Sequence, residues 1–447
     1  MHVISPFPTD LGSPFPITNI PFGVFSTTGK PEKRVGIAIG TYILDLALLE
    51  QHDFFSDALK DGYLQAVRPE THISRAPFFG QPYLNAFASL PSSAHTAVRT
   101  RIICLLQDSS SPLFTDPNLN NAAFSSQKQA TMHLPMRVGD FSDFMCSRTH
   151  VDNCSRLADA STPSNFHAFP TAYNGRASSL IVSGTPILRP HGMLLNPSSQ
   201  TYEFGASKRM DYELELGFFV SKPVPFGQRI ASADEAKQHI FGFVLLNDWS
   251  ARDIQFAEMR PLGPFNGKGC ATTISPWVVT LDALEEAEVE IADQEAMGSM
   301  AGRPPHLRHE STKQTWSIEV GVQVRRNGWK EPLTTVAKSD LKALYWTPAQ
   351  MLSHHASSGC GLRTGDLLGT GTISSPGEDE GDTVSSLGCL HELNMGGTKP
   401  FLLENGEGIT WIEDGDEVIL SGRIAGQNGS AGFVSYKFIL YPIFADA

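Results

Sequence analysis

The sequence predicts a mainly β protein with some α-helix, and three observations support this class. Runs of β-branched and aromatic residues recur along the chain at the length of strands. Glycine and proline separate these runs, as they do at turns. Amphipathic helical patterns are few. Since 41% of the 447 residues are hydrophobic, the chain can bury a large core, and wholesale disorder is excluded.

Charge, hydropathy and cysteine usage limit the partners and the cellular location that the chain can have. The formal net charge is −13 and the isoelectric point is near 5.5, which argues against a nucleic-acid or anionic-membrane partner because both need basic patches. The most apolar stretch, Ile240–Leu246, is far shorter than the roughly 20 residues of a membrane-spanning helix. The first residues lack a secretory pattern, and the six cysteines include no C-x-x-C pair. We therefore expect a cytoplasmic enzyme with reduced thiols.

The first part of the chain predicts an N-terminal β domain over residues 1–130. Alternating apolar residues, separated by glycines, predict a small antiparallel sheet from the strands Gly23–Ser26, Arg34–Gly40 and Tyr42–Leu46. A helix is predicted over Ala94–Leu106. The polar stretch Asp108–Asn121 then leads to a second domain, which we expect over residues 131–447.

The second domain is rich in predicted strands. These are Ser178–Ser183, Glu213–Val220, Phe241–Asn247, Ile274–Leu281, Trp316–Arg325 and Ser435–Pro442. The best helical pattern is Ser339–His354. Two segments, Ala283–Ser311 and Ser374–Gly388, are rich in acidic or small residues. We expect both to be solvated surface without a chemical role.

Two glutamates on one predicted strand are the most informative local pattern. Glu213 and Glu215 point to one face of the strand, and Leu214 and Leu216 point to the other. The apolar run Phe218–Val220 argues against an open, solvated face. Two buried carboxylates side by side repel each other and need a cation to compensate them. The alternative is an exposed face with two ordinary glutamates.

Two further charged residues follow buried strands. Asp248 ends the apolar run Phe241–Asn247, where it could contribute to a site or serve as a helix N-cap. Lys268 lies in a turn rich in glycine and proline, Pro261–Lys268. If it is buried it would bind an anion or an oxyanion, and if it is exposed it is a surface charge.

The segment Asp140–His150 mixes acidic, aromatic and histidine residues without a clear period, which is typical of a loop that forms a site. His150 could act as a general base, since an imidazole titrates near pH ~6.5. His354 and His355 are adjacent and would not face one ligand on a helix, so we interpret both as structural.

Together these segments resemble the fumarylacetoacetate hydrolase family along nearly the whole chain. The resemblance is carried, in order, by Pro21–Ser26, Gln129–His150, Tyr173–Ser179, Met210–Val220, Asn247–Gln255, Thr272–Val279 and Leu362–Ser374. It implies a small SH3-like N-terminal barrel, a larger C-terminal mixed β-roll and a homodimer.

The resemblance also implies a metal centre. The family's metal ligands correspond to Asp143, Glu213, Glu215 and Asp248, a set of hard oxygen ligands suited to Ca²⁺ or Mg²⁺. A second cation position would involve Asp248, Lys268 and Thr272.

The implied activity is the hydrolysis of a carbon–carbon bond in a 1,3-diketone acid. In the family, fumarylacetoacetate is cleaved to fumarate and acetoacetate, in tyrosine and phenylalanine catabolism. The catalytic histidine corresponds to His150 and its orienting carboxylate to Glu392. Arg252, Gln255 and Lys268 correspond to the groups that stabilise developing negative charge.

Some substrate-binding positions differ from the family. Met145 and Met259 replace tyrosines, and Asp159 stands where an arginine is expected, whereas Tyr173 and Thr372 are present. Because a methionine cannot donate a hydrogen bond to a carboxylate, two enzymatic alternatives remain. The substrate carboxylate is met by another cation, Arg156, Arg260 or Lys268, or the chain is a paralogue that hydrolyses or decarboxylates a different β-dicarbonyl. A third alternative, a non-catalytic metal-binding relative, would not be expected to keep His150, Glu392 and all four carboxylates.

Overall fold

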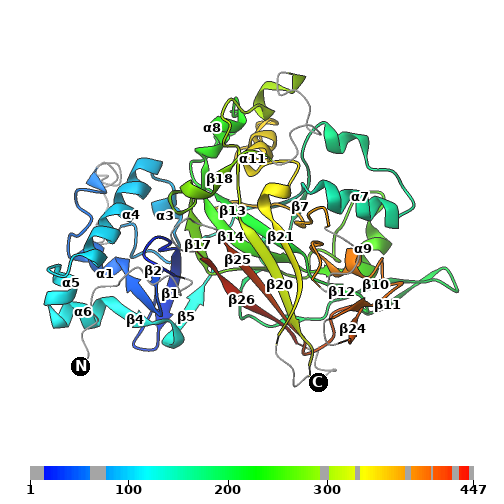
Figure 1. The fold of residues 1–447 in the computed structure, drawn as a ribbon, viewed down its shortest axis with the longest axis horizontal. Helices are drawn as coiled ribbons and strands as arrows, with labels where there is room; N and C mark the ends of the chain where they lie inside the picture. Colours follow the sequence, from blue (N-terminus) through cyan, green and yellow to red (C-terminus); the bar gives the residue numbers. More distant parts are fainter. Residues whose placement is uncertain are drawn as a thin grey trace.

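The computed structural model describes residues 15–60, 77–291, 302–327, 333–377, 384–403, 406–424 and 432–441. It is mainly β with some helix (Figure 1), as predicted. Among these residues, no helix is both long enough and apolar enough to cross a membrane.

The N-terminal strands form the antiparallel sheet that the sequence predicts. β1 (Phe22–Thr27), β2 (Lys30–Ile39), β3 (Tyr42–Asp45) and β4 (Phe124–Ser126) pair in that order. β5 (Ala130–His133) pairs with β1 on its other edge. The predicted helix over Ala94–Leu106 is confirmed as α4 (Ser92–Gln107). The other α-helices that the structure describes in this part are α1 (Leu46–Gln51), α3 (Asn85–Ala88), α5 (Pro112–Thr115) and α6 (Pro117–Ala123).

The N-terminal strands continue into the central sheet of the molecule, because β1 also pairs with β17 (Trp277–Thr280). From β17 the strand order is β14 (Ile240–Asp248), β13 (Leu214–Val220), β22 (Leu367–Gly369), β6 (Phe141–Met145) and β7 (Thr171–Gly175). β16 (Thr272–Ile274) pairs with the end of β14 and with β8 (Leu180–Val182). All residues of β13 and β14 are buried.

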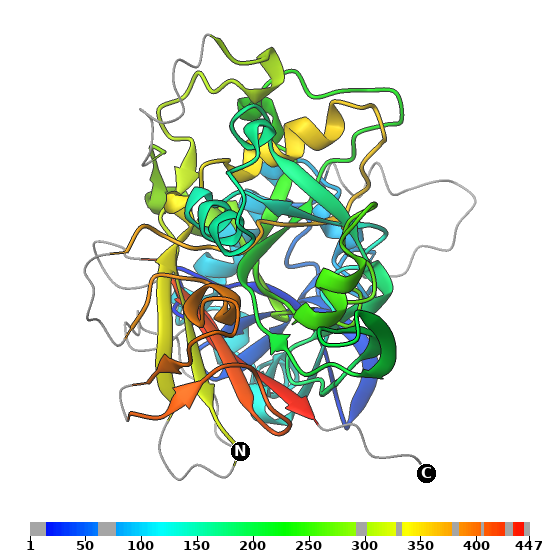
Figure 2. The same cartoon turned by 90° about the vertical axis from the view of Figure 1, so that its right-hand side faces the viewer.

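A second sheet covers one face of these central strands (Figures 1 and 2). Its order is β21 (Thr334–Asp340), β20 (Glu319–Arg325), β25 (Glu417–Arg423), β26 (Gly432–Tyr441) and β9 (Ile187–Leu188). Leu216 and Phe218 pack on this side, in a core with Val322 and Leu420, whereas Phe219 joins the core of the N-terminal part. The apolar runs of β13 and β14 thus arise because both faces of these strands are covered.

One predicted helix is wrong in its first half. Within Ser339–His354, Ser339 still belongs to β21, and a 3₁₀ turn covers Leu341–Ala343. The α-helix, α11, spans only Pro348–Ala356. Its start is determined by Thr347, which forms a capping box with Gln350, and by Pro348 at the first helical position.

The remaining elements are short. A hairpin of β10 (His191–Asn196) and β11 (Thr201–Ala206) extends from the body of the molecule at the right of Figure 1. The other elements are α7 (Arg148–Leu157), α8 (Ala233–Lys237), α9 (Arg252–Glu258), α12 (Leu390–Leu393), β12 (Met210–Asp211), β15 (Ser250–Ala251), β18 (Glu288–Val289), β19 (Thr315–Trp316), β23 (Phe401–Leu402) and β24 (Gly408–Ile409).

Both segments expected to be solvated surface fall partly outside the described residues, at 292–301 and 378–383, and Pro442 at the end of the last predicted strand does as well. Within the described part, the expectation for Ala283–Ser311 is wrong at Leu284, Ala287, Ile291 and Leu307, which are buried in the core. The expectation for Ser374–Gly388 is wrong at Ser374. This side chain is fully buried, and it contacts the site described below.

Candidate active site

Four carboxylates converge at the ends of the central strands. Asp143 lies on β6, Glu213 directly precedes β13, Glu215 is its second residue, and Asp248 is the last residue of β14. One oxygen from each lies within 4.8 Å of the others. Paired residues on neighbouring strands point to the same face of a sheet, and the pairing Gly217–Gly369–Asp143 places the Asp143 side chain on the face of Glu215. The two glutamates therefore share one face, as predicted.

The position of Asp143 corrects the sequence interpretation of Asp140–His150 as a loop. Phe141–Met145 is a strand held by β22 on one side and by β7 on the other. Arg148 begins the helix α7, which Ser147 caps by accepting a hydrogen bond from the backbone N–H of His150. The strand carries the carboxylate and the first turn of the helix carries the imidazole, so both are held by regular structure.

The four carboxylates are buried and only partly compensated by protein groups. Asp143 Oδ1 and Glu215 Oε1 have no hydrogen-bond partner among the described residues. Burial, followed by the charge of Asp248, raises the pKa of Asp143 well above its ordinary value, and burial with the charge of Asp143 does the same to the pKa of Glu215. Without a cation these two groups would keep their protons. The residues fit a hard divalent cation, since orphaned carboxylate oxygens are its preferred ligands.

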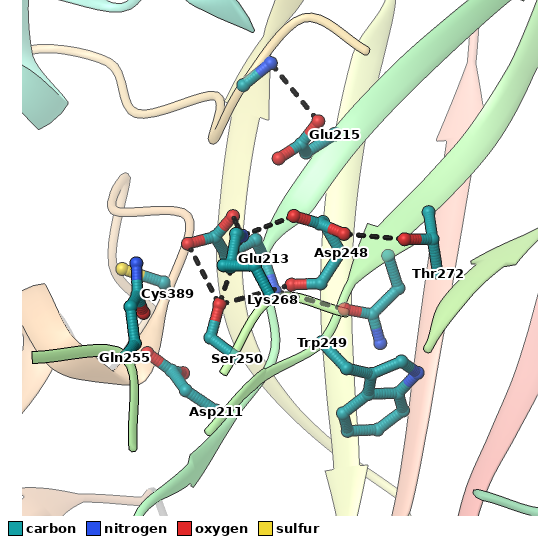
Figure 3. A network of polar contacts seen from close by, with 12 residues as sticks. Asp211, Glu213, Glu215, Asp248, Trp249, Ser250, Gln255, Lys268, Thr272 and Cys389 are labelled. Carbon is teal, nitrogen blue, oxygen red and sulfur yellow. Dashed lines mark hydrogen bonds and ion pairs between the residues drawn. The ribbon is translucent and has the colours of Figure 1, made fainter. Parts of the chain in front are cut away.

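Two buried cations, Lys268 and Arg252, balance the remaining charge of the cluster, and Figure 3 shows the contacts of Lys268. Lys268 Nζ lies 2.5 Å from Glu213 Oε2, is also paired with Asp248, and donates to Ser250 Oγ at 3.1 Å. Burial alone would lower the pKa of Lys268, but Asp248 and Glu213 raise it above its ordinary value. Lys268 is thus a buried, charged residue and not a surface lysine.

Arg252 links the carboxylate cluster to α12. Its Nε donates to Asp211 Oδ2 at 2.8 Å, and its Nη1 lies 2.9 Å from Glu213 Oε1. Asp211 in turn accepts hydrogen bonds from the backbone N–H groups of Leu390 and His391. Asp211 was not among the predicted site residues, although it lies only two residues before Glu213.

Asp248 is held by two hydroxyl groups. Thr272 Oγ1 donates to its Oδ1 at 2.6 Å, and Tyr173 Oη donates to its Oδ2 at 2.7 Å. The alternative that Asp248 is a helix N-cap is wrong, because α9 begins after Ala251. Thr272 is thus brought to Asp248, which is also paired with Lys268.

His150 and Glu392 form a hydrogen-bonded pair across 242 residues of sequence. His150 Nδ1 lies 2.7 Å from Glu392 Oε2. Asn153 Nδ2 and Ser374 Oγ also donate to this carboxylate, at 2.9 and 2.8 Å. Burial acts to raise the pKa of Glu392, but these donors, His150 above all, lower it to about 2. The ionised carboxylate holds the proton on Nδ1, so that Nε2, which lies 3.6 Å from Cys154 Sγ, is the ring nitrogen that could act as a base.

The pKa of His150 is shifted in the opposite direction. Burial alone would lower it, but the neighbouring Cys154 and Glu392 raise the pKa of His150 well above its ordinary value. An imidazole held this way is a stronger base than a free histidine.

A cavity of about 600 Å³ opens onto these groups. His150, Asp143, Glu213, Arg252 and Lys268 line it, together with all five positions expected to bind substrate. These five are Met145, Tyr173, Gln255, Met259 and Thr372. Gln255 Oε1 accepts a hydrogen bond from Arg252 Nη1 at 3.3 Å.

Several groups expected to be structural lie outside this site. His355 Nε2 is 2.7 Å from Ser142 Oγ, and His354 stacks on His306.

All six cysteines are free thiols, as predicted. Asn153 and Ser374 were missed by the sequence analysis, because nothing local marks a side chain whose partner, Glu392, is so distant in sequence.

Comparison with known proteins gives a consistent result. The family model "Fumarylacetoacetase N-terminal" matches residues 18–135, and "Fumarylacetoacetate (FAA) hydrolase C-terminal" matches residues 141–429. Human fumarylacetoacetase is 42% identical over 426 residues, which are 94% of each chain. The enzymes of that name from Arabidopsis thaliana and Caenorhabditis elegans are 39% identical over 433 residues and 40% identical over 421 residues. The former match covers 95% of each chain, and the latter 93% of this chain and 94% of the relative.

Proposed function

The chain belongs to the fumarylacetoacetate hydrolase family, and from this premise we propose that it hydrolyses the carbon–carbon bond of a 1,3-diketone acid. Fumarylacetoacetate is the substrate that the relatives' name indicates, with fumarate and acetoacetate as products, as in tyrosine and phenylalanine catabolism. The observation that carries the proposal is the His150–Glu392 pair, at 2.7 Å, in the wall of a cavity that also contains the buried carboxylate cluster.

We propose Asp143, Glu213, Glu215 and Asp248 as ligands of a Ca²⁺ or Mg²⁺ ion, with a second position beside Asp248, Lys268 and Thr272. The two orphaned oxygens and the excess of negative charge support this assignment. When bound, such an ion supplies a Lewis acid for the oxygens of the diketone.

His150 is the proposed general base. Its Nε2 takes a proton from water, and the resulting hydroxide attacks one carbonyl carbon of the substrate. Glu392 stabilises the imidazolium that forms and maintains the orientation of the ring. When the carbon–carbon bond breaks, the electron pair leaves on the departing carbon, and the proton on His150 can return to that carbon.

Gln255 is the proposed hydrogen-bond donor to the oxyanion. Arg252 orients its amide, and the amide nitrogen is positioned to donate to a negative oxygen in the cavity. Lys268 supplies positive charge nearby, although its own donors are engaged with Glu213, Asp248 and Ser250. These roles assign a chemical function to each of the five catalytic positions.

Membership of this family also supports proposals about the domains, the oligomeric state and the location of the protein. We propose a small SH3-like barrel within residues 1–130, a catalytic β-roll over residues 131–447, and a homodimer in the cytoplasm. The exposed apolar side chains of the β10–β11 hairpin, Met193, Leu195, Tyr202 and Phe204, support association with a second copy.

The test is to add fumarylacetoacetate to the purified protein with Mg²⁺ or Ca²⁺ and to follow the loss of diketone absorbance. Activity should disappear with a chelator and should fall by about 10²–10⁴-fold in His150→Ala. His52→Ala, at an exposed histidine, is the matched control. Absence of turnover in the metal-loaded wild type, or full activity of His150→Ala, would refute the proposal.

A further inference from the structure

Much of the cavity wall is apolar, and its apolar part extends away from the catalytic histidine. Leu157 and Ala158 line the cavity seven and eight residues beyond His150, which is roughly 10 Å further along α7. Met145 follows Asp143 on β6, and Phe256 and Met259 lie on and just after α9. The catalytic groups therefore occupy only one end of the wall.

The described residues that line this cavity include four basic side chains, Lys268, Arg252, His150 and His391. Three of them are paired with protein groups, and the fourth is neutral. Lys268 has three acceptors, Glu213, Asp248 and Ser250. Arg252 is paired with Asp211 and Glu213. Each of these two cations is thus held at the catalytic end by buried carboxylates.

The two histidines of the wall are also unsuited to hold a distant carboxylate. His150 is paired with Glu392. His391 is buried, and burial, followed by the charges of Arg252 and His150, lowers its pKa to about 3. His391 is therefore a neutral imidazole at pH 7 and offers no positive charge.

The arginines that could replace the missing family arginine do not reach the cavity. Arg156 donates to Asn153 Oδ1 at 2.8 Å on the exposed side of α7. Arg260 is exposed, and neither it nor Arg156 is among the described residues that line the cavity. Asp159, the residue at the family position, is itself acidic and exposed.

The polar groups that share the cavity with this wall include the hydroxyl group of Thr372 and the neutral His391, and neither carries a charge. A carboxylate placed against this apolar wall would therefore lose its hydration without gaining a cation. Methionine side chains, in contrast, adapt to irregular apolar groups. We propose that the apolar part of the cavity binds an uncharged, apolar end of the substrate. The preferred substrates are then 1,3-diketone acids with a carboxylate at one end only.

This inference rests on the proposed function and is tested with three substrates. These are fumarylacetoacetate and its two monomethyl esters, each assayed with saturating Mg²⁺, with product analysis by mass spectrometry to confirm carbon–carbon cleavage. We expect one monoester to have a kcat/KM at least 10-fold above that of the diacid. If the diacid is cleaved faster than both esters, the inference is wrong and the proposed function stands. If none of the three is cleaved, the proposed function itself fails.

A pair of variants tests the role of the apolar wall. Met259→Arg should place a guanidinium near the apolar end of the substrate. The ratio of kcat/KM for the preferred monoester to kcat/KM for the diacid should then fall at least 10-fold. Met259→Leu, which stays apolar, should keep the wild-type ratio. Because each ratio is measured within one protein, partial loss of folding does not affect it. An unchanged ratio in Met259→Arg would overturn the assignment of this wall to the substrate.

Discussion

Gly369 of β22 lies directly opposite Asp143 of β6, and the absence of a side chain at Gly369 leaves room for the carboxylate cluster. A Cβ atom at Gly369 would lie 2.7 Å from Asp143 Oδ1 and 3.0 Å from Glu215 Oε2. Two of the proposed ligands thus approach each other over a strand position that only glycine can occupy without displacing them.

The first prediction follows from this contact. Gly369→Ala should push the two carboxylates apart and weaken Ca²⁺ binding by about 10-fold or more, measured by isothermal titration calorimetry. Gly29→Ala is the matched control, because a Cβ at Gly29 would meet nothing within 4 Å. Equal affinity in Gly369→Ala and wild type would show that the ion does not depend on this geometry.

The second prediction concerns the pH dependence of activity. Glu392 contributes to the raised pKa of His150, and a general base must be unprotonated to act. The acidic limb of kcat/KM should therefore lie above pH 6.5 in wild type. Glu392→Gln should move this limb to lower pH and reduce kcat about 100-fold, because the imidazolium loses its counter-charge. A pH–rate profile for both proteins measures this, and a limb that does not move would contradict the pairing.

The third prediction concerns stability in the presence of a chelator. Burial raises the pKa values of Asp143 and Glu215 above those of ordinary carboxyl groups. Their contribution to the free energy of unfolding is therefore full below pH ~4, the range of an unfolded carboxyl, and is lost as the pH rises through the folded values. Urea unfolding in the presence of a chelator should therefore give a lower free energy of unfolding at pH 8 than at pH 5.

A cation should reverse this loss, because it binds the ionised carboxylates. With Ca²⁺ at 100 times its Kd, the free energy of unfolding at pH 8 should rise by about 2.7 kcal/mol, and the gain should shrink toward pH 5. Asp143→Asn is the control, since it should lose less stability between pH 5 and pH 8 in chelator. Equal losses in the two proteins would show that Asp143 does not titrate as described.

Some features of the fold and of the site could be predicted from the sequence, because they depend on residues that are neighbours in the chain. The strands β1 to β3 are joined by short turns, and the alternation around Glu213 and Glu215 places both carboxylates on one face. The buried state of Asp248 follows in the same way from the apolar run before it.

Other features depend on partners far away in sequence and left no local signal. The sequence predicts a loop at Phe141–Met145, because the strand is formed only by its pairing with β7 and with β22, which lies more than 200 residues later. Ser374 was expected on the surface, but it is buried because its hydroxyl group meets Glu392. The start of α11 could have been found from Thr347, Pro348 and Gln350, which form a recognisable capping pattern.

The last prediction separates transition-state stabilisation from substrate binding. Gln255 is held by Arg252 and faces the cavity, so its amide should act on the oxyanion and not on the ground-state substrate. Gln255→Ala should lower kcat about 100-fold and leave KM nearly unchanged. Gln255→Glu should be at least as impaired, because its carboxylate would repel the oxyanion. Gln228→Ala, at an exposed glutamine, should keep full activity. If Gln255→Ala instead raised KM with an unchanged kcat, Gln255 would be a binding residue only, and the oxyanion would depend on Lys268.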